Sequence, residues 1–502
     1  MNMKRYILVF LFLVSFVLLY SQEVRPLVHL KPVIAGDSVA VLELFKSNDS
    51  VNVYADDVLF GVNFINHNLS LSIDEEHEGF SLFVENANVE KLTIIVVYQS
   101  NDSINESMVW GINFDDNRKQ MLTTTNYFAS VKSFKYRDEI DKNPIINSAV
   151  FSLPKYHNDT LLRVDFFNND TLPFVGYVSE ILIFDQSILA IDLQKYQTYL
   201  AIKYGVSLID KDYINSRGDT IWYIDTEYNQ NIAGISFDTA FSLLQNTSHS
   251  SIEDMINLSL ENTDIESFFL NYNHNSVLWA DNGFEIDATE IIEDIWNMPI
   301  EVLKRRWKLF VSGTWSDSDS FSLKFDGKDI GIQPHDECNL IITRRQEDFY
   351  DKVFEIIYPD SIGDDGFVYF SGIQWDTDGS GEDFFTFGIQ KAEVSQTHSS
   401  VISIDDNNSQ KNKKILPTDI PEVPMVSVFP NPSKGLYYLD IRSEIETKFD
   451  IEIYNSMGSL IKSYEINSAF SKLKADTIAE SGIYYIVIKS NISNTVLKLI
   501  IN

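Results

Sequence analysis

The sequence comprises 502 residues, with 39 Lys plus Arg against 73 Asp plus Glu, which gives a formal net charge of −34. Because such a chain repels phosphate backbones and anionic lipid, we expect neither nucleic acid nor a membrane surface as a direct partner. The one cysteine, Cys338, excludes an intramolecular disulfide and zinc sites with two cysteine ligands, and its apolar run predicts a buried strand thiol.

The N-terminus has the pattern of an export signal. Basic Met1–Arg5 precedes the apolar run Tyr6–Leu19, and small Ser21 lies directly before Gln22. The run is too short to span a membrane, and no other segment reaches spanning length, so no transmembrane segment is expected. The pattern predicts a Sec signal peptide over residues 1–21, cleaved between Ser21 and Gln22.

Residues 22–205 are expected to form a β-rich domain that ends in a helix. Short apolar runs between Asn, Asp and Ser turns predict strands at residues 90–98, 108–114, 149–153, 161–167 and 174–185. Apolar residues then recur at helical spacing at Leu189, Leu193, Tyr196, Leu200 and Tyr204. Ser187 is placed to cap this helix, and Gly205 is placed to end it.

Two motifs in this region resemble a known family. They are Gly176-Tyr-Val-Ser-Glu-Ile-Leu-Ile-Phe-Asp185 and Tyr199-Leu-Ala-Ile-Lys-Tyr-Gly-Val-Ser-Leu208. Together they resemble the end of LamG-like, concanavalin A-like domains of Bacteroidetes surface proteins, in which the last jelly-roll strand leads into a "YLA-KYG" helix. The resemblance implies a jelly roll over residues 22–205 that binds a glycan or protein ligand.

Residues 206–395 resemble the uncharacterised module that follows such jelly rolls. The resemblance depends on four segments in the same order, Ile221–Tyr223, Tyr228–Ile235, Leu278–Gly283 and Arg306–Phe310. Late strand-like runs predict that this module closes as a second β-sandwich. Residues 396–424 lack apolar periodicity and carry spaced prolines, which is typical of a linker.

Residues 425–502 have the pattern of a compact all-β module. Apolar or alternating runs occur at hairpin spacing, at residues 437–441, 449–454, 460–466, 483–488 and 496–501. The module holds eight Lys plus Arg and eight Asp plus Glu, so the whole net charge of −34 lies upstream of it.

The motifs of this module resemble the type A C-terminal sorting domain of the Bacteroidetes type IX secretion system, an Ig-like β-sandwich. The residues that carry the match are Phe429, Pro430, Asn431, Pro432, Gly435, Gly458, Gly482, Tyr484 and Lys498. The resemblance implies export across the outer membrane to the cell surface or extracellular space. It also implies the type IX machinery and its sorting peptidase as partners. The expected fold of the whole chain is therefore all-β.

One carboxylate motif resembles a catalytic signature. Glu285-Ile-Asp-Ala-Thr-Glu290 matches the E-x-D-x-x-E pattern of retaining β-glucanases, in which carboxylates on one strand act as nucleophile, helper and general acid. The motif lies beyond the predicted jelly roll, however, and residues 287–296 resemble the start of a helix, where acids complement the helix dipole. We therefore expect no catalytic residues.

A second acidic segment resembles half of a calcium loop. Asp376–Asp383 has oxygen donors at alternate positions and a glycine at the sixth, as in an EF-hand. The twelfth position is Phe387, so the bidentate carboxylate is missing. An acidic hairpin is favoured over a weak Ca²⁺ site, and no cofactor or resident metal is expected.

A recurrent tripeptide resembles the acceptor motif for periplasmic O-glycosylation in Bacteroidetes. It consists of Asp-Ser or Asp-Thr followed by an aliphatic residue or Ala, and such pairs also occur at ordinary junctions between turns and strands. The hydroxyls that would be modified are those of Ser38, Ser50, Ser103, Thr160, Thr171, Thr220, Thr239 and Ser361.

The sequence favours a secreted or cell-surface binding or adhesion protein without catalytic activity. A glycoside hydrolase with a jelly-roll domain and a structural surface or matrix component are the alternatives. Residues 113–117, 127–130 and 155–159 combine aromatic rings with Asn, Asp or Ser between predicted strands, so they are the expected ligand-binding rim of the jelly roll.

Overall fold

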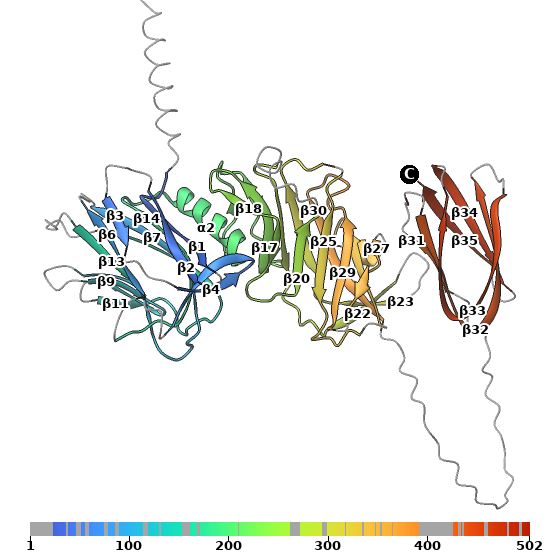
Figure 1. Ribbon diagram of the computed structural model, residues 1–502, viewed down its shortest axis with the longest axis horizontal. Helices are drawn as coiled ribbons and strands as arrows, with labels where there is room; N and C mark the ends of the chain where they lie inside the picture. Colours follow the sequence, from blue (N-terminus) through green and yellow to red (C-terminus); the bar gives the residue numbers. More distant parts are fainter. Residues whose placement is uncertain are drawn as a thin grey trace, which may run out of the picture. The chain divides into compact units, whose positions relative to one another are not determined.

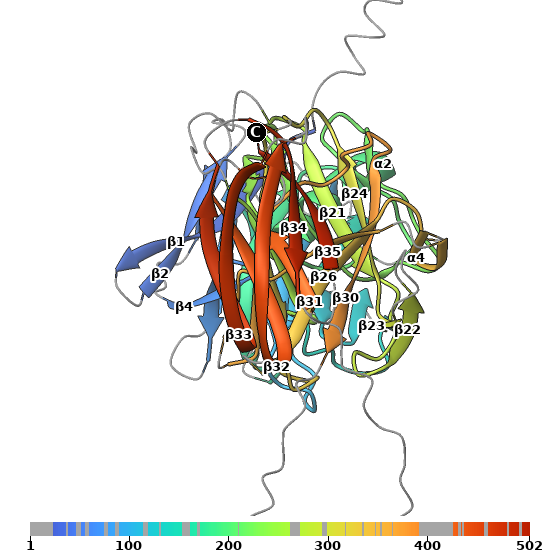
Figure 2. The same ribbon diagram turned by 90° about the vertical axis from the view of Figure 1, so that its right-hand side faces the viewer.

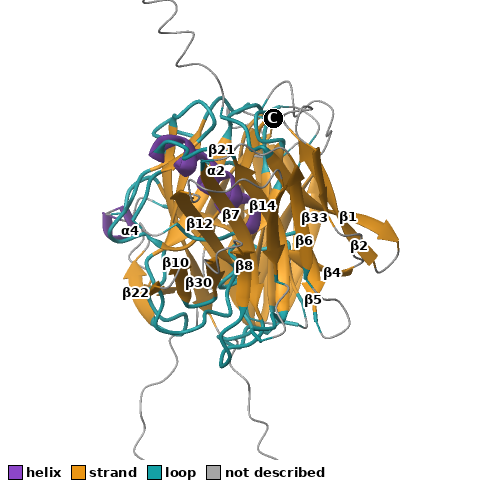
Figure 3. Ribbon diagram, turned by 90° about the vertical axis from the view of Figure 1, so that its left-hand side faces the viewer, coloured by secondary structure: helices purple, strands orange, loops and turns teal. Residues whose placement is uncertain are grey.

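The computed structural model describes residues 24–36, 39–46, 52–55, 60–74, 79–85, 90–113, 119–129, 132–152, 161–167, 171–208, 210–261, 272–293, 299–316, 318–333, 336–346, 348–351, 354–363, 365–390, 425–429, 433, 436–455, 460–478, 481–490 and 494–501. The chain divides into two compact units, Met1–Gln396 and Thr397–Asn502. Strands make up most of the described chain, as predicted (Figure 3). Within the described ranges no helix has the length and apolar character needed to cross a membrane.

The N-terminal part of the first unit is a sandwich of two antiparallel sheets, called the first sandwich here (Figure 1). One sheet holds, in spatial order, β1 (Val28–Gly36), β2 (Val39–Lys46), β4 (Phe60–Ile65), β5 (Asn68–Ile73), β14 (Gly176–Phe184), β7 (Lys91–Ser100) and β12 (Ile145–Ser152). The other holds β11 (Lys132–Lys135), β10 (Asn126–Ala129), β9 (Lys119–Thr123), β8 (Met108–Asn113), β13 (Leu161–Phe166), β6 (Phe80–Glu85) and β3 (Asn52–Ala55). The five strand runs predicted between residues 90 and 185 all fall on observed strands.

The two sheets of the first sandwich enclose an aromatic core. Trp110 stacks on Phe151 with ring centroids 5.2 Å apart, and Phe80 stacks on Phe166 at 5.3 Å. All four side chains are buried. Because burial of apolar surface is the main stabilising term, this core contributes to holding the two sheets face to face.

The predicted helix is present as α2 (Ala190–Tyr204) and ends at Gly205, whose φ of 62° is left-handed, as the sequence indicated. The predicted cap is wrong. The helix begins after Leu189, which has an extended backbone and makes no side-chain capping bond. Packing of α2 against the sheet, rather than capping by Ser187, therefore fixes where the helix starts.

A buried carboxylate fastens α2 to the first sandwich. Glu180 of β14 has no solvent exposure and accepts hydrogen bonds from Tyr199 Oη at 2.8 Å, Tyr204 Oη at 3.0 Å and His29 Nε2 at 2.6 Å. Lys203 Nζ completes the set as an ion pair. Burial alone would raise the pKa of Glu180, but the charge of Lys203 and the hydrogen bond from His29 outweigh it and hold that pKa well below its usual value.

The second half of the first unit is another β-sandwich, called the second sandwich here. Its larger sheet holds β18 (Leu243–Gln245), β17 (Gln230–Asp238), β21 (Ser276–Asp281), β24 (Trp307–Ser312), β30 (Glu382–Gln390), β23 (Pro299–Leu303) and β22 (Thr289–Glu293), with β26 (Glu337–Thr343) and β27 (Glu355–Ile357) attached beside β30. The facing sheet holds β19 (Thr247–His249), β20 (Ile256–Leu260), β25 (Phe321–Asp326), β29 (Phe367–Ile373) and β28 (Ser361–Ile362). A small ribbon, β15 (Tyr213–Ile214) with β16 (Thr220–Trp222), and the short helix α4 (Asp348–Asp351) complete it.

Helix α2 lies between the two sandwiches (Figure 1). Tyr196 and Tyr199 of α2 also contact Phe241 of the second sandwich, with ring centroids 5.0 and 5.2 Å apart. Asn66, in the turn between β4 and β5, donates to the carbonyls of Ile202 and Lys203 at 3.1 Å each. These contacts join both sandwiches into one unit.

The C-terminal unit is a single sheet curled around its own apolar core. It holds β31 (Met425–Phe429), β32 (Leu436–Asn455), β33 (Leu460–Thr477), β34 (Gly482–Lys489) and β35 (Asn494–Ile501). Figure 2 shows these strands in red, with long, curved β32 and β33. Two runs predicted as separate strands, 437–441 and 449–454, form one continuous strand, because β33 pairs with β32 along most of its length.

We predict that Glu180→Gln lowers the free energy of unfolding by about 3–5 kcal/mol, because it leaves the cation of Lys203 beside a buried site without its partner. Equilibrium urea unfolding of the chain without residues 1–21 measures this. Glu43→Gln, at an exposed carboxylate of the same sheet, is the matched control and should change the value by less than about 0.5 kcal/mol. Equal effects of both variants would show that Glu180 does not fasten α2.

Candidate functional site

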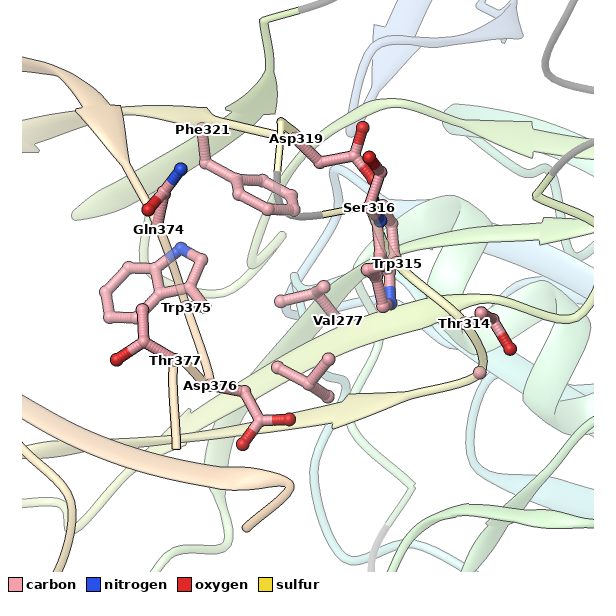
Figure 4. Close-up of a pocket in the computed structure, with 12 residues that line it drawn as sticks. Val277, Thr314, Trp315, Ser316, Asp319, Phe321, Gln374, Trp375, Asp376 and Thr377 are labelled. Carbon is pink, nitrogen blue, oxygen red and sulfur yellow. Dashed lines mark hydrogen bonds between the residues drawn. The ribbon is translucent and has the colours of Figure 1, made fainter. Parts of the chain in front are cut away.

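A hollow of the second sandwich lies at one end of its two sheets. It is a pocket of about 540 Å³ between the loop that follows β24 and the loop that follows β29 (Figure 4). Its aromatic lining consists of Trp315, Phe321 and Trp375, and its polar lining includes Asp319, Gln374 and Asp376. We call it the Trp315–Trp375 pocket.

Figure 4 shows Trp315 and Trp375 on opposite sides of this pocket. Trp315 is half-buried, and its indole N–H donates to the carbonyl of Ser312 at 3.0 Å. Trp375 is 8% exposed, and its indole nitrogen has no hydrogen-bond partner within the described chain. A buried donor without a partner costs about 1–3 kcal/mol, so this N–H is an unusual feature of a native structure.

The Trp315 wall is held in place by one carboxylate. Asp319 is buried and accepts hydrogen bonds at both oxygens, from Tyr272 Oη at 2.7 Å and from the backbone N–H of Ser316 at 2.7 Å. Burial and the hydrogen bond to Asp319 raise the pKa of Tyr272 to about 12. Asp319 therefore serves to close the loop that presents Trp315.

A buried ion pair supports the Trp375 wall. Asp383 has no solvent exposure and accepts from Arg344 Nη1 at 2.6 Å and from the backbone N–H of Asp376 at 2.6 Å. Arg344 also donates to Thr377 Oγ1 at 2.6 Å, so one guanidinium contacts the middle of the loop and the strand that follows it. Burial raises the pKa of Asp383 to about 6, although these hydrogen bonds act in the opposite direction.

The segment considered for calcium is the acidic loop that joins β29 of one sheet to β30 of the facing sheet. The hairpin that the sequence favoured is wrong, because these two strands pair with other strands and not with each other. Asp376 Oδ1 accepts from the N–H of Gly381 at 2.7 Å, and Asp383 is turned inward to Arg344. Across the described parts of the chain, no three His, Cys, Asp or Glu side chains are grouped so that they could hold a metal ion. That the protein needs no cofactor stays a prediction.

The β-glucanase-like carboxylates do not form a shared cleft. Glu285 and Asp287 are exposed, whereas Glu290 pairs with the buried guanidinium of Arg306. The helix predicted over residues 287–296 is wrong. Residues Thr289–Glu293 form strand β22, because pairing with β23 buries Ile292 and overrides the local helical pattern.

Cys338 lies within the described residues, whereas the expected ligand-binding rim does so only in part. Cys338 is fully buried in β26, as predicted. Of the expected rim, Tyr127 donates to Gln120 Oε1 at 2.6 Å, and Asn113 ends β8 exposed. Residues 114–117, 130 and 155–159 lie outside the described residues.

Some of the expected glycosylation acceptors lie within the described residues and others lie outside them. Exposed positions are Ser103, Thr171, Thr239 and Ser361, whereas Thr220 is half-buried. Ser38, Ser50 and Thr160 lie outside the described residues, as do Ser21 and Gln22 at the expected signal cleavage site. Glycosylation and cleavage stay predictions.

The predicted sorting residues lie on the strands of the C-terminal unit or next to them. Phe429 ends β31, and Gly482 begins β34. Tyr484 is buried in β34, and Lys498 of β35 is paired with Tyr485 of β34. Pro430, Asn431, Pro432, Gly435 and Gly458 lie outside the described residues.

The sequence did not reveal the Trp315–Trp375 pocket. Its two tryptophans are sixty residues apart, and only the pairing of Phe321 in β25 with Ile373 in β29 brings their loops to the same end of the sandwich. The available signal was weak. Trp315 is followed by Ser and Trp375 by Asp, and such pairs also occur in ordinary turns.

A second cavity, of about 530 Å³, lies at the junction of the two sandwiches. Several of its polar groups have partners within the chain. Lys211 donates to Gln197 Oε1 at 2.9 Å, Asn231 donates to Asp281 Oδ2 at 2.9 Å, and Asp225 pairs with Lys308 at 3.2 Å.

Two family models match the chain. A secretion system C-terminal sorting domain matches residues 427–502, and a domain of unknown function (DUF8202) matches residues 192–380. The second match begins within α2 and covers the Trp315–Trp375 pocket. The sorting domain identifies a protein exported by the type IX secretion system to the cell surface or extracellular space, and it implies interaction with the type IX machinery. The LamG-like assignment of residues 22–205 stays a prediction.

No curated protein matches the chain. Among solved structures, dimeric latent PorU from Porphyromonas gingivalis is 11% identical over 92% of this chain and 35% of its own, with a TM-score of 0.17. Salmonella alpha-2-macroglobulin reacted with methylamine is 8% identical over 92% of this chain and 32% of its own, with a TM-score of 0.12. The chain thus spans about a third of each, and scores this low do not establish a common fold.

We predict that stability depends on pH through Asp383. Its folded pKa of about 6 lies above 3.8, the ordinary value of an aspartate, so the folded state binds the proton more tightly. The contribution of Asp383 to stability therefore falls as pH rises from about 4 to about 6. The free energy of unfolding, measured relative to Asp383→Asn by denaturation at several pH values, should fall by up to about 3 kcal/mol over this range. Asp329→Asn, at an exposed carboxylate, is the control. A pH-independent difference would contradict the assignment.

Proposed function

We propose that this exported protein is a non-catalytic binding or adhesion protein whose ligand site is the Trp315–Trp375 pocket, with a glycan or protein ligand. The pocket supports this proposal because apolar walls with a few polar groups are typical of ligand sites, and its volume of about 540 Å³ lies within their usual range. Export to the surface places such a site where it meets external ligands.

The carboxylates of the pocket favour binding over hydrolysis. Glycoside hydrolysis needs one carboxyl group to protonate the leaving group and a second to act as nucleophile or base. Both oxygens of Asp319 already accept hydrogen bonds from the protein, and Asp376 Oδ1 accepts the N–H of Gly381. These groups therefore build the loops of the pocket. A glycoside hydrolase and a structural matrix component remain the alternatives.

Export is tested by truncation. We predict that a chain without residues 425–502 accumulates in the periplasm, because it lacks the domain that the secretion machinery recognises. Protease shaving of intact cells, followed by immunoblotting of cell fractions, measures the location, with the full chain as control. Surface display of the truncated chain would contradict the assignment.

Binding is tested in the pocket itself. We predict that Trp315→Ala weakens binding of any ligand found on an array of glycans and extracellular matrix proteins by at least about tenfold, because aromatic anchors dominate such sites. Phe284→Ala removes an exposed aromatic side chain outside the pocket and should leave binding unchanged. Unfolding temperatures of both variants check the fold. Equal binding by wild type and Trp315→Ala would contradict the proposed site.

A further inference from the structure

We propose that two copies of this chain associate through strand β12 (Ile145–Ser152) of the first sandwich. The two strands pair antiparallel about a twofold axis at Ser148. The inference goes beyond the proposed function, because it concerns a strand edge and not the Trp315–Trp375 pocket. Four features of β12 carry it: its free edge, its composition, the fit of its sequence to a second copy of itself and the charge around it.

Strand β12 ends its sheet, and its outer edge is unpaired within the described chain. It pairs only with β7, from Ile145 opposite Tyr98 to Ser152 opposite Lys91. Figure 3 shows β12 beside β7. Every second residue of an edge strand points its backbone N–H and C=O away from the neighbouring strand. The outer edge of β12 therefore offers a row of donors and acceptors to another strand.

The composition of β12 leaves this edge unprotected. Edge strands of soluble proteins usually carry charged residues or proline, or are very short, because these features prevent pairing between molecules. Strand β12 has eight residues, Ile-Ile-Asn-Ser-Ala-Val-Phe-Ser, with neither charge nor proline. The other edge strands of more than five residues in the described sheets are β1, β33 and β35, and they contain Lys31, Lys462 and Lys498, respectively. Of these long edges, β12 is therefore the one open to pairing.

The two faces of β12 differ in what they contact. Ile145 and Phe151 belong to the core between the two sheets of the first sandwich. Ser148 lies on the opposite face, where its hydroxyl accepts a hydrogen bond from Gln197 of α2 at 3.1 Å. Because side chains alternate along a strand, Ile146 and Val150 share the face of Ser148.

This pattern is complementary to itself in one antiparallel register. When Ser148 lies opposite Ser148 of the second copy, Ile146 lies opposite Val150, and Ile145 lies opposite Phe151. Apolar residues then meet on both faces, which is the favourable type of cross-strand pair. Val150 is 46% exposed in the single chain, and the second copy covers it.

The local charge permits this approach, although the whole chain has a net charge of −34. Residues 132–152 hold four Lys plus Arg and three Asp plus Glu, so the border around β12 is nearly balanced. Repulsion between the rest of the two chains acts over longer distances and is screened by salt. We therefore expect the dimer to become tighter as the salt concentration rises, whereas a basic peptide on the same edge would bind more weakly.

The test measures the oligomeric state of the chain without residues 1–21 by sedimentation equilibrium. One strand pair covers less area than a standard interface, so we expect a dissociation constant between about 1 µM and 1 mM. Val150→Lys places a charge at the edge and should raise this constant at least about tenfold. Ile291→Lys makes the same change at an exposed position of edge strand β22 and should leave it unchanged. A chain that stays monomeric throughout this range, or a dimer that Val150→Lys does not weaken, would overturn the inference.

Cross-linking tests the register separately. Two copies of Ser148→Cys lie opposite each other, with Cα atoms about 4.5–5.5 Å apart, and should form a disulfide under mild oxidation. Two copies of Ser152→Cys lie eight residues out of register, about 27 Å apart, and should not. The natural Cys338 is fully buried, so it adds little background. Non-reducing electrophoresis measures the products, and unfolding temperatures check that all variants fold.

Equal cross-linking of both cysteine variants would contradict the antiparallel register. A monomeric chain that binds a strand peptide at β12 would make another protein the occupant of this edge and would also overturn the inference. Neither result bears on ligand binding in the Trp315–Trp375 pocket, which Trp315→Ala tests independently.

Discussion

The arrangement of the first unit depends on the carboxylate of Glu180. A charge with no solvent exposure is stable only when donors surround it, and here three of its four donors, Tyr199, Lys203 and Tyr204, come from one helix. The spacing of these residues places them on the face of α2 that meets the sheet. In this chain, therefore, Tyr199, Lys203 and Tyr204 hold the helix against the strand that precedes it.

Helix α2, held against the first sandwich by Glu180, also provides the surface on which the second sandwich packs. Asn66 accepts the N–H of His249 at 2.8 Å while it caps the end of the helix. A Cβ atom on Gly205 would lie 2.3 Å from the carbonyl oxygen of His249, so glycine is required by contact as well as by its φ of 62°. The end of the helix is therefore part of the junction, and a boundary at residue 205 would cut through packed structure. The Trp315–Trp375 pocket thus belongs to a unit that includes both sandwiches.

Both walls of the pocket are built by aspartates that act on the backbone. Asp319 and Asp383 are buried and each accepts a backbone N–H, so the loops carrying the two tryptophans are closed by local hydrogen bonds. Such short-range closure is consistent with the many Asp and Ser residues of the sequence, which the same physics places in turns. Whether these Asp- and Ser-rich turns form a pocket, however, depends on which of them the fold brings to the same end of the sandwich.

The sequence by itself determined the all-β class, the position of α2 and the sorting domain. The signals were short or alternating apolar runs for the strands, a glycine at the end of a helical pattern for α2, and a long ordered set of motifs for the sorting domain. All of these are local signals. Only the tertiary structure decided the rest. Residues 287–296 have a helical pattern, yet Thr289–Glu293 form a strand because β23 pairs with them, and Glu290 contacts Arg306 rather than a substrate cleft. The tryptophan pocket likewise arises from the register of β25 on β29. The pairing of β25 with β29 joins segments that are far apart in the sequence, and the residue pattern of either segment does not specify its partner.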